Sequence, residues 1–347
     1  SFMHALQREI QLRAGFLPRE PLDTLYFGGG TPSVLSLNQL ERIVSSLQFI
    51  YGFKDTIELT IEVNPDDVTE KYLQGLRQIG FNRLSAGVQS FYRSDLKLMN
   101  RRHGRGQAIE SLLMAAEMGF ENISIDLIYG IPGQTPDGLQ SNLKQAVQLP
   151  VKHISAYHLT YENGTPLNAW RLRGKVKPVA EAQSVALYEL LTQFLAQQGY
   201  QHYEISNFGL PGYYSRHNMA YWTQVPYLGL GPSAHSYNGE IRAWNVYSIQ
   251  RYMKAIKNET LPLEEEKLDK TAHFNDYLLT SLRTSTGISY DVIADRFGME
   301  YLTYLYEFIA DYKVNPGLIQ FTLDGFHLTE HGFLFADRII SDMMKVD

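Results

Sequence analysis

The chain has 347 residues, 44% of them hydrophobic and 20% charged, which is enough to bury a core in one large domain and a smaller one. Its net charge of -6 argues against partners that attract basic patches, such as nucleic acids or anionic membranes, and no apolar run is long enough to cross a bilayer. The absence of cysteine excludes disulfides, thiolate nucleophiles and cysteine-bound metals within these residues.

The first thirteen residues predict an amphipathic helix and not a signal peptide, so we expect a cytoplasmic protein. Short β-like runs then alternate with helical patterns. The predicted strands are Thr24–Phe27, Ile57–Val63, Arg83–Gln89, Asn122–Ile128 and His153–Leu159. The predicted helices between them are Leu37–Phe49, Thr69–Ile79, Gly106–Met118 and Leu139–Leu149, with Thr69 as an N-cap and Gly80 as a C-cap. Such a series indicates parallel strands with right-handed crossovers.

These strands alternate apolar and polar residues, whereas buried parallel strands are usually apolar throughout. Between Ile57 and Asn64, for example, every second residue is polar: Glu58, Thr60 and Glu62. A closed barrel fills its interior with aliphatic side chains, so a polar interior indicates a polar ligand. We therefore predict an α/β fold, an open, partial β/α barrel of the TIM type without its first strand. An antiparallel sheet with one face in solvent is the alternative, which the intervening helices disfavour.

The second half of the chain predicts a different organisation. A helix at Val179–Gln198 and a strand at Tyr203–Ile205 precede a long ordered connection, residues 208–244, which is rich in glycine, proline and aromatics. The glutamate run within residues 261–270 predicts a domain linker, because like charges extend a chain. Two helical patterns, a hairpin around Asp324-Gly325 and a final helix from about Gly332 then resemble a winged helix.

We accordingly expect three parts: a partial barrel at 1–205, a connecting region at 206–262 and a winged-helix-like domain at 263–347. Residues 263–347 hold 7 basic and 15 acidic side chains, whereas a DNA-binding wing needs the opposite balance. The winged part is therefore not expected to bind nucleic acid.

The first predicted strand ends in Tyr26-Phe27-Gly28-Gly29-Gly30-Thr31-Pro32. Three glycines leave the backbone bare, so that its amide and carbonyl groups can approach a ligand. The segment is neither the GxGxxG dinucleotide fingerprint nor a P-loop. Alone, a glycine-rich turn is more often only a turn.

Four polar residues belong to the same edge of the predicted barrel: Glu62, Gln89, Arg101 and Asp126. They lie at or beyond the carboxyl ends of parallel strands, where barrel ligands bind. Together they offer a carboxylate for an ammonium group, a cation for a carboxylate and acceptors for ribose hydroxyls. An internal salt-bridge network is the alternative. With the glycine turn, the set matches a zwitterionic nucleoside better.

Five motifs follow one another in the chain: Tyr26–Pro32, Ile61-Glu62-Val63-Asn64-Pro65, Arg83–Phe91, Asn100-Arg101 and Ile125–Thr135. Their order and spacing resemble the radical-SAM proteins of the HemN/HemW group, and the resemblance covers essentially the whole chain. It implies that S-adenosylmethionine is bound by Gly29, Gly30, Thr31, Glu62, Gln89, Arg101 and Asp126, with Thr160 near the adenosine. It also implies that the winged region is the accessory domain of that group.

The resemblance further implies a Cys-x3-Cys-x2-Cys loop just before the helix with which this chain begins. In such proteins that loop holds three irons of a [4Fe-4S] cluster, and the fourth iron binds and cleaves S-adenosylmethionine. Without cysteine the chain cannot do this, so we assign no catalytic residue and no metal ligand within it. Because a barrel without its first strand is unusual, we expect that this segment was cut off or left out. A naturally inactive relative is the alternative.

A second motif is Arg216-His217-Asn218-Met219-Ala220-Tyr221-Trp222, followed by Leu228–Ser236. His217 is a candidate axial ligand of haem iron, and Tyr221 and Trp222 are suited to pack on a porphyrin face. A histidine in an aromatic loop is more often structural. Yet His-Asn-x-x-Tyr-Trp resembles the signature of the haem-chaperone branch, HemW, which the coproporphyrinogen dehydrogenases, HemN, lack. The resemblance implies a haem site made of His217, Asn218, Tyr221, Trp222 and His235.

The leading expectation is thus a protein that binds haem as cargo and passes it to acceptors such as respiratory enzymes, supported by S-adenosylmethionine and, in the intact protein, the cluster. The alternative is an oxygen-independent coproporphyrinogen III oxidase, or dehydrogenase, of porphyrin biosynthesis. A third alternative, a pure binding module, fits the truncated chain but not the intact site. We expect no nucleic acid partner, no integral membrane segment, and at most a peripheral contact with membranes.

Overall fold

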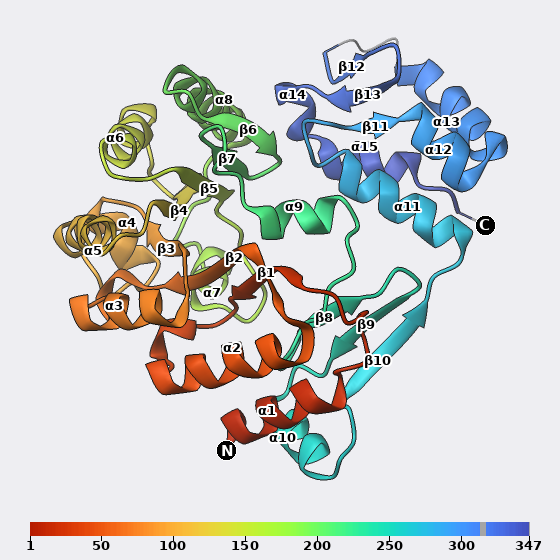
Figure 1. Ribbon diagram of the computed structural model, residues 1–347. Coiled ribbons are helices and arrows are strands. Elements are labelled where there is room, and N and C mark those ends of the chain that lie inside the picture. Colours follow the sequence, from red (N-terminus) through yellow and green to blue (C-terminus); the bar gives the residue numbers. More distant parts are fainter. Residues whose placement is uncertain (313–316, 347) are drawn as a thin grey trace. The chain divides into compact units, whose positions relative to one another are not determined.

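The computed structural model describes residues 1–312 and 317–346 (Figure 1). Its residues divide into two compact units. Unit 1 contains residues 1–23, 38–57 and 216–347, and unit 2 contains residues 24–37 and 58–215. Among the described residues, no helix has the length and apolar character needed to cross a membrane. The three predicted parts, 1–205, 206–262 and 263–347, stay a prediction.

A curled sheet of seven strands forms the centre of unit 2, in the order β1-β2-β3-β4-β5-β7-β6. The neighbouring pairs from β2 to β5 are parallel, which confirms the predicted open α/β barrel. Its strands are β1 (Leu22–Phe27), β2 (Phe53–Val63), β3 (Arg83–Gln89), β4 (Asn122–Tyr129), β5 (His153–His158), β6 (Gln201–Glu204) and β7 (Asn207–Gly209).

Helices cover one face of this sheet, as Figure 1 shows for α3, α5, α6 and α8. The cap residues of α3 are as predicted: the Thr69 hydroxyl accepts from the Tyr72 amide, and Gly80 has a left-handed φ of 109°. The helical elements of unit 2 are η1 (Pro32–Val34), η2 (Pro65–Asp67), α3 (Glu70–Ile79), α4 (Arg93–Leu98), α5 (Arg105–Glu117), α6 (Pro136–Val147), α7 (Pro166–Leu172) and α8 (Glu181–Gln197).

The parallel register places polar residues of neighbouring strands side by side. Ser85 of β3 is level with Glu62 of β2 and with Ser124 of β4, and Asp126 is level with Ser155 of β5. Side chains at matching positions of paired strands point to the same face of a sheet. The apolar residues of the alternate set, such as Ile61, Leu84, Ile123 and Ile125, are buried. One face therefore forms the apolar core and the other collects the polar groups.

The end of the sheet differs from the prediction. A single strand was expected at Tyr203–Ile205, but the chain forms a hairpin, in which β7 lies between β5 and β6 and is antiparallel to both. The reversal takes place at Ile205-Ser206, between strands of only four and three residues. Runs this short carry too little alternation for a pattern to reveal both strands.

The first part of unit 1 combines helices with a three-stranded antiparallel sheet of order β10-β9-β8. Its elements are α1 (Phe2–Leu12), α2 (Leu37–Tyr51), α9 (Arg216–Trp222), β8 (His235–Tyr237), β9 (Ile241–Asn245), α10 (Ile249–Lys257) and β10 (Leu263–Lys267). The linker predicted at 261–270 is therefore wrong: the glutamate run is the exposed edge strand β10. Glu266 pairs with Arg242 of β9 at 3.5 Å, which offsets part of the repulsion among the glutamates.

A buried carboxylate ties α1 to two distant segments of unit 1. Glu9 is 0% exposed and accepts hydrogen bonds from the Tyr252 hydroxyl (2.6 Å), the Asn245 amide nitrogen (2.6 Å) and the Gly231 backbone N–H (2.8 Å). A buried charge of this kind is tolerated only when its oxygens are satisfied. Glu9 therefore fixes α1 to α10, to β9 and to the loop before β8.

The C-terminal part of unit 1 is a small helical domain with a hairpin. The predicted turn at Asp324-Gly325 is confirmed, and the hairpin pairs Phe321 with Phe326. The elements are α11 (Lys270–Ser281), β11 (Ile288–Ser289), α12 (Tyr290–Phe297), α13 (Met299–Tyr312), β12 (Ile319–Phe321), β13 (Gly325–Leu328), α14 (Glu330–Phe333) and α15 (Ala336–Met343), with strand order β11-β13-β12.

Candidate functional site

The glycine turn after β1 is held by the carboxylate of Glu62, which projects from β2. Glu62 Oε2 accepts from the Gly29 backbone N–H at 3.1 Å, and Oε1 accepts from the Tyr26 hydroxyl at 2.8 Å. Gly29 and Gly30 have φ angles of 76° and 69°, which side chains other than glycine rarely adopt. Both are exposed, and nothing lies within 4 Å of where a Cβ would stand. The turn therefore presents bare backbone beside a carboxylate.

Gly28 is required for a different reason: the side chains of Tyr26 and Glu62 lie too close to its backbone to leave room for a side chain. A Cβ at this position would stand 2.4 Å from a ring carbon of Tyr26 and 2.7 Å from Glu62 Oε1. Any side chain there would push Glu62 out of its hydrogen bonds. The first glycine of the motif thus makes room for Glu62, and the second and third provide the turn.

Asp126 of β4 supplies a second carboxylate on the polar face. Burial, together with the nearby charge of Glu62, raises its pKa to about 7, and hydrogen bonds from Ser155 and Ser85 and the charge of Arg83 oppose this rise. The Ser85 hydroxyl lies 3.5 Å from Asp126 Oδ1. Burial also raises the pKa of Tyr26, next to Glu62, so its phenol stays protonated and can donate. The polar face thus carries two carboxyl groups, Glu62 and Asp126.

Gln89 ends β3 with a backbone φ of 66° and is buried. Its amide nitrogen lies next to Gly87: a Cβ built on Gly87 would stand 3.0 Å from Gln89 Nε2 and 3.7 Å from Asn64 Oδ1. A positive φ in a residue other than glycine is uncommon and is often maintained at binding sites. Gln89 is therefore directed by its backbone toward the end of β2, which also carries Glu62.

The remaining predicted residues are less closely tied to this group. Thr31 precedes η1 and its hydroxyl does not cap that helix. Arg101 and Thr160 are exposed on the loops after α4 and β5. In the described parts of the chain, no contact joins Arg101 or Thr160 to Glu62 or Asp126. Glu62 and Asp126 thus lie on the same face of the sheet, Gln89 ends β3, and Arg101 and Thr160 lie on loops at the edge of the sheet.

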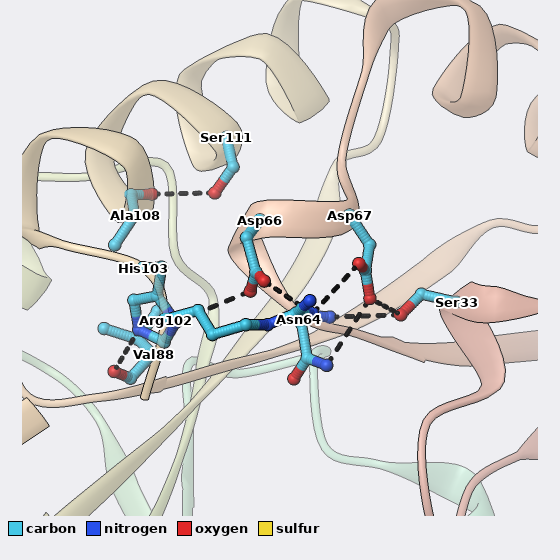
Figure 2. A network of polar contacts seen from close by, with 9 residues as sticks. All are labelled: Ser33, Asn64, Asp66, Asp67, Val88, Arg102, His103, Ala108 and Ser111. Atoms are coloured by element: carbon cyan, nitrogen blue, oxygen red, sulfur yellow. Dashed lines mark hydrogen bonds and ion pairs between the residues drawn. The ribbon is translucent and has the colours of Figure 1, made fainter. Parts of the chain in front are cut away.

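A polar network that sequence reasoning missed connects the loops of the site (Figure 2). Asp67 of η2 accepts from the Ser33 hydroxyl at 2.7 Å, and Arg102 pairs with Asp66 at 2.7 Å and with Asp67 at 3.5 Å. His103 is buried, its Nε2 is 3.0 Å from the Val88 carbonyl, and its Nδ1 is 3.9 Å from Asp66 Oδ1.

Each member of this network is a close neighbour in sequence of a predicted cofactor residue. Ser33 follows Thr31, Asp66 and Asp67 follow Glu62, and Arg102 follows Arg101. The two aspartates therefore act as a common anchor for three loops that come from different strands (Figure 2). The available signal was the Asn64–Asp67 run, with two acids in the first turn of η2.

These residues fit S-adenosylmethionine but not the cluster. Two carboxylates, the exposed backbone of the glycine turn and the Gln89 amide are suited to an ammonium group, a carboxylate and ribose hydroxyls. A [4Fe-4S] cluster needs thiolate ligands, and the sequence has no cysteine. Across residues 1–312 and 317–346, no group of three or more His, Asp or Glu side chains is placed to hold a metal ion.

The second motif forms the short helix α9. His217 Nε2 lies 2.9 Å from the Tyr221 hydroxyl one turn later, and the two rings meet edge to face with centroids 5.0 Å apart. Arg216 anchors the start of the helix through the Thr56 carbonyl and Asp23, the latter at 3.4 Å. Tyr221 is 38% exposed, and its burial beside Tyr227 raises its pKa to about 12. The His217 imidazole and the Tyr221 phenol therefore form a hydrogen bond near the surface.

An aromatic series continues from α9 to β8. Tyr221 meets Tyr227 edge to face at 4.6 Å, and Tyr227 and Tyr237 exchange two backbone hydrogen bonds of 2.7 and 2.9 Å. His235, at the other end of β8, is exposed and stacks on Trp244. A Cβ on Gly229 would stand 2.1 Å from the His235 carbonyl, so only glycine fits there. The predicted haem residues thus belong to one connected part of unit 1.

Trp222 closes the motif. Its indole nitrogen is inaccessible, and within the described residues it has no hydrogen-bond acceptor. A buried N–H without an acceptor is costly and uncommon in folded proteins. Within the described residues the indole N–H is thus both enclosed and without an acceptor, and a ligand reaches it only if the side chains around it move.

Comparison with known proteins places this geometry in context. Residues 4–146 match the Radical SAM superfamily. The protein called Heme chaperone HemW from Lactococcus lactis subsp. lactis is 34% identical over 328 residues, which span 94% of this chain and 86% of that protein. The Bacillus subtilis protein of the same name is 31% identical over 340 residues, 97% of this chain and 89% of that one. A solved structure, the radical SAM enzyme coproporphyrinogen III oxidase (HemN) from Escherichia coli, has a TM-score of 0.84 at 26% identity and covers 99% of this chain and 82% of its own.

Proposed function

The chain belongs to the HemW family of radical SAM proteins, and from this membership we propose that it binds haem and delivers it to acceptor proteins such as respiratory enzymes. The observation that carries the proposal is helix α9, which sets His217 and Tyr221 one turn apart beside Trp222. Histidine is a common axial ligand of haem iron, and aromatic rings pack well on a porphyrin.

In this proposal His217 is the axial ligand, and Asn218, Tyr221, Trp222 and His235 line the rest of the haem site. The indole N–H of Trp222 lacks an acceptor within the described residues and would donate to a haem propionate. If iron binds to Nε2 of His217, the hydrogen bond between Nε2 and the Tyr221 hydroxyl must first break. If iron binds to Nδ1, this hydrogen bond can remain.

S-adenosylmethionine belongs to the proposal as the second ligand. Gly29, Gly30 and Thr31 would frame it with backbone, Glu62 and Asp126 would accept from its ammonium and ribose hydroxyl groups, and Arg101 would meet its carboxylate. Gln89 and Thr160 complete the proposed set. When bound, S-adenosylmethionine supplies the radical chemistry of the superfamily only at a reducing cluster. The sequence offers that cluster no thiolate, so no catalytic residue and no reaction step are assigned.

Titration of the protein with haem, followed by absorbance, tests the proposal. His217→Ala should lose binding, because the iron loses its ligand. His4→Ala is a matched control, since His4 is exposed on α1 of the same unit and outside the motif. Equal haem affinity in both variants would contradict the assignment of His217.

A second candidate function is oxygen-independent coproporphyrinogen III oxidation, favoured by the likeness to HemN over 99% of the chain. A version of the protein that carries the cysteine loop of the group, with its cluster reconstituted, should be given coproporphyrinogen III and S-adenosylmethionine. Formation of protoporphyrinogen would overturn the chaperone proposal. Stable haem binding without turnover would support it.

The place of action is part of the same proposal. We propose a cytoplasmic protein whose contact with membranes is at most peripheral. Fractionation of cells that express the tagged protein tests this: recovery in the supernatant, or release from membranes by high salt, is expected. Retention through a high-salt wash would contradict it.

A further inference from the structure

A cavity of about 270 Å³ lies in unit 2, formed by residues other than those predicted to bind the cofactor. Its walls come from the connection between β3 and α4, the first residue of α5 and the second half of α6. Phe91 and the buried Asn142 belong to its lining, and polar side chains surround them. The cavity is open to solvent and mainly polar.

Positive charge is concentrated in this cavity. Of the described residues that line it, Arg93, Arg105 and Lys144 are cationic and none is acidic. The whole chain has 31 basic and 37 acidic residues, so a lining with three cations and no acid departs from its average. Asp95 on α4 is the adjacent acid in sequence, and its oxygens accept from the Ser90 and Ser94 hydroxyls at 2.7 and 3.2 Å. Within the described part of the chain, no ion pair joins Arg93, Arg105 or Lys144 to an acid.

The walls are fixed by hydrogen bonds before any ligand binds. Asn142, 2% exposed, accepts from the Phe91 backbone N–H at 2.8 Å and donates to the Ser90 hydroxyl at 3.1 Å, which joins α6 to the end of β3. The Arg105 guanidinium donates to the Gln145 side chain, which joins α5 to α6. A site that is already ordered loses less conformational entropy on binding.

We propose that this cavity binds an oxyanion of the phosphate class, either free or as part of an organic phosphate. Two guanidinium groups and an ammonium match a phosphate dianion better than the single charge of a carboxylate. Arg105 is the first residue of α5, so the positive end of the dipole of a 13-residue helix adds to the same field. The proposal is independent of the haem function, because it involves none of the proposed haem or S-adenosylmethionine residues.

Calorimetric titration with inorganic phosphate at low ionic strength tests the proposal. The double variant Arg93→Gln/Arg105→Gln should bind phosphate at least about tenfold more weakly, because two charge-assisted hydrogen bonds are lost. Lys144→Gln, a second variant, should show a smaller loss. Arg173→Gln is the matched control, since Arg173 is exposed in the same unit and does not line the cavity. Wild-type protein that does not bind phosphate, or a double variant that binds it equally well, would overturn the proposal.

Two further titrations identify the source of the phosphate. Glycerol 3-phosphate represents a soluble ester, and vesicles of phosphatidylglycerol in phosphatidylcholine represent a lipid headgroup. Binding of the ester that is lost in the double variant assigns a soluble ligand. Vesicle binding lost in that variant, without ester binding, assigns a lipid. Haem affinity should be the same in all of these variants, which separates a failure of this proposal from a failure of the haem proposal.

Discussion

Tyr221 engages Nε2 of His217, which is one of the two ring nitrogens that can bind haem iron. Tyr221→Phe keeps the aromatic ring and removes the hydroxyl that competes for Nε2. Since a hydrogen bond contributes about 1 kcal/mol, haem should bind the variant roughly fivefold more tightly. Absorbance titration measures this, with Tyr247→Phe, an exposed tyrosine of the same unit, as the control. Weaker binding by Tyr221→Phe would mean that the phenol itself assists the haem.

The carboxyl of Asp126 makes stability depend on pH. Its pKa of about 7 in the folded protein exceeds the unfolded value near 3.8, so between these values the folded state binds a proton that the unfolded state does not. The stabilisation from this group is fully present below pH 4 and is lost as the pH rises through 7. The stability of wild-type protein relative to Asp126→Asn should therefore fall by at most about 4 kcal/mol between pH 4 and pH 8. Urea unfolding at several pH values measures the difference, and parallel pH curves would refute it.

Single residues differ in how far the sequence reveals them. The alternation of apolar and polar residues in β2 and β4 made Glu62 and Asp126 recognisable as candidates, because the residues next to each of them are apolar. The amphipathic pattern of the first thirteen residues places Glu9 on the polar face of the predicted helix, beside Gln7 and Arg8, yet Glu9 is fully buried. Its three donors lie 222 to 243 residues later in the chain, and no local pattern reports such partners.

Among the elements, η2 has the clearest testable role. Asp66→Asn removes the ion pair with Arg102, and so loosens the loop that carries Arg101. Because the Arg102 side chain is 73% exposed, stability should change by less than about 1 kcal/mol. Affinity for S-adenosylmethionine should fall about fivefold or more, since the loops must then be ordered by the ligand. Calorimetry and thermal unfolding measure the two quantities.

Asp55→Asn is the control for this experiment, because Asp55 is an exposed acid on the distal part of β2. If Asp66→Asn binds S-adenosylmethionine as tightly as Asp55→Asn does, the network is only structural. A large loss of stability would equally contradict a role limited to positioning.

The elements that the sequence predicted share one property: their pattern is local. The parallel strands β2 to β5 and their helices are long enough for periodicity to show, and they match within a few residues. The strands β6, β7 and β10 are short or charged, and their existence depends on partners elsewhere, as when β10 pairs with β9. Non-local pairing is what pattern reading misses.

For the molecule as a whole, the absence of cysteine gives a direct expectation. After anaerobic reconstitution with iron and sulfide, the chain as given should show no iron–sulfur absorption, because no thiolate is present. Desalting followed by iron and sulfide analysis checks the result. A cluster that survives desalting would require ligands other than cysteine.

Glu9 also bears on the order in which the protein is made. Unit 1 is assembled from three separate stretches, whereas unit 2 is complete once residue 215 has been synthesised. During synthesis on the ribosome, the Glu9 carboxylate of α1 gains its three donors only when Gly231, Asn245 and finally Tyr252 have been added to the chain. Domains form as their contacts become available during synthesis. The half of the molecule that carries His217 is therefore the late one, and the contacts of α1 with residues 231–252 form only after those residues have been synthesised.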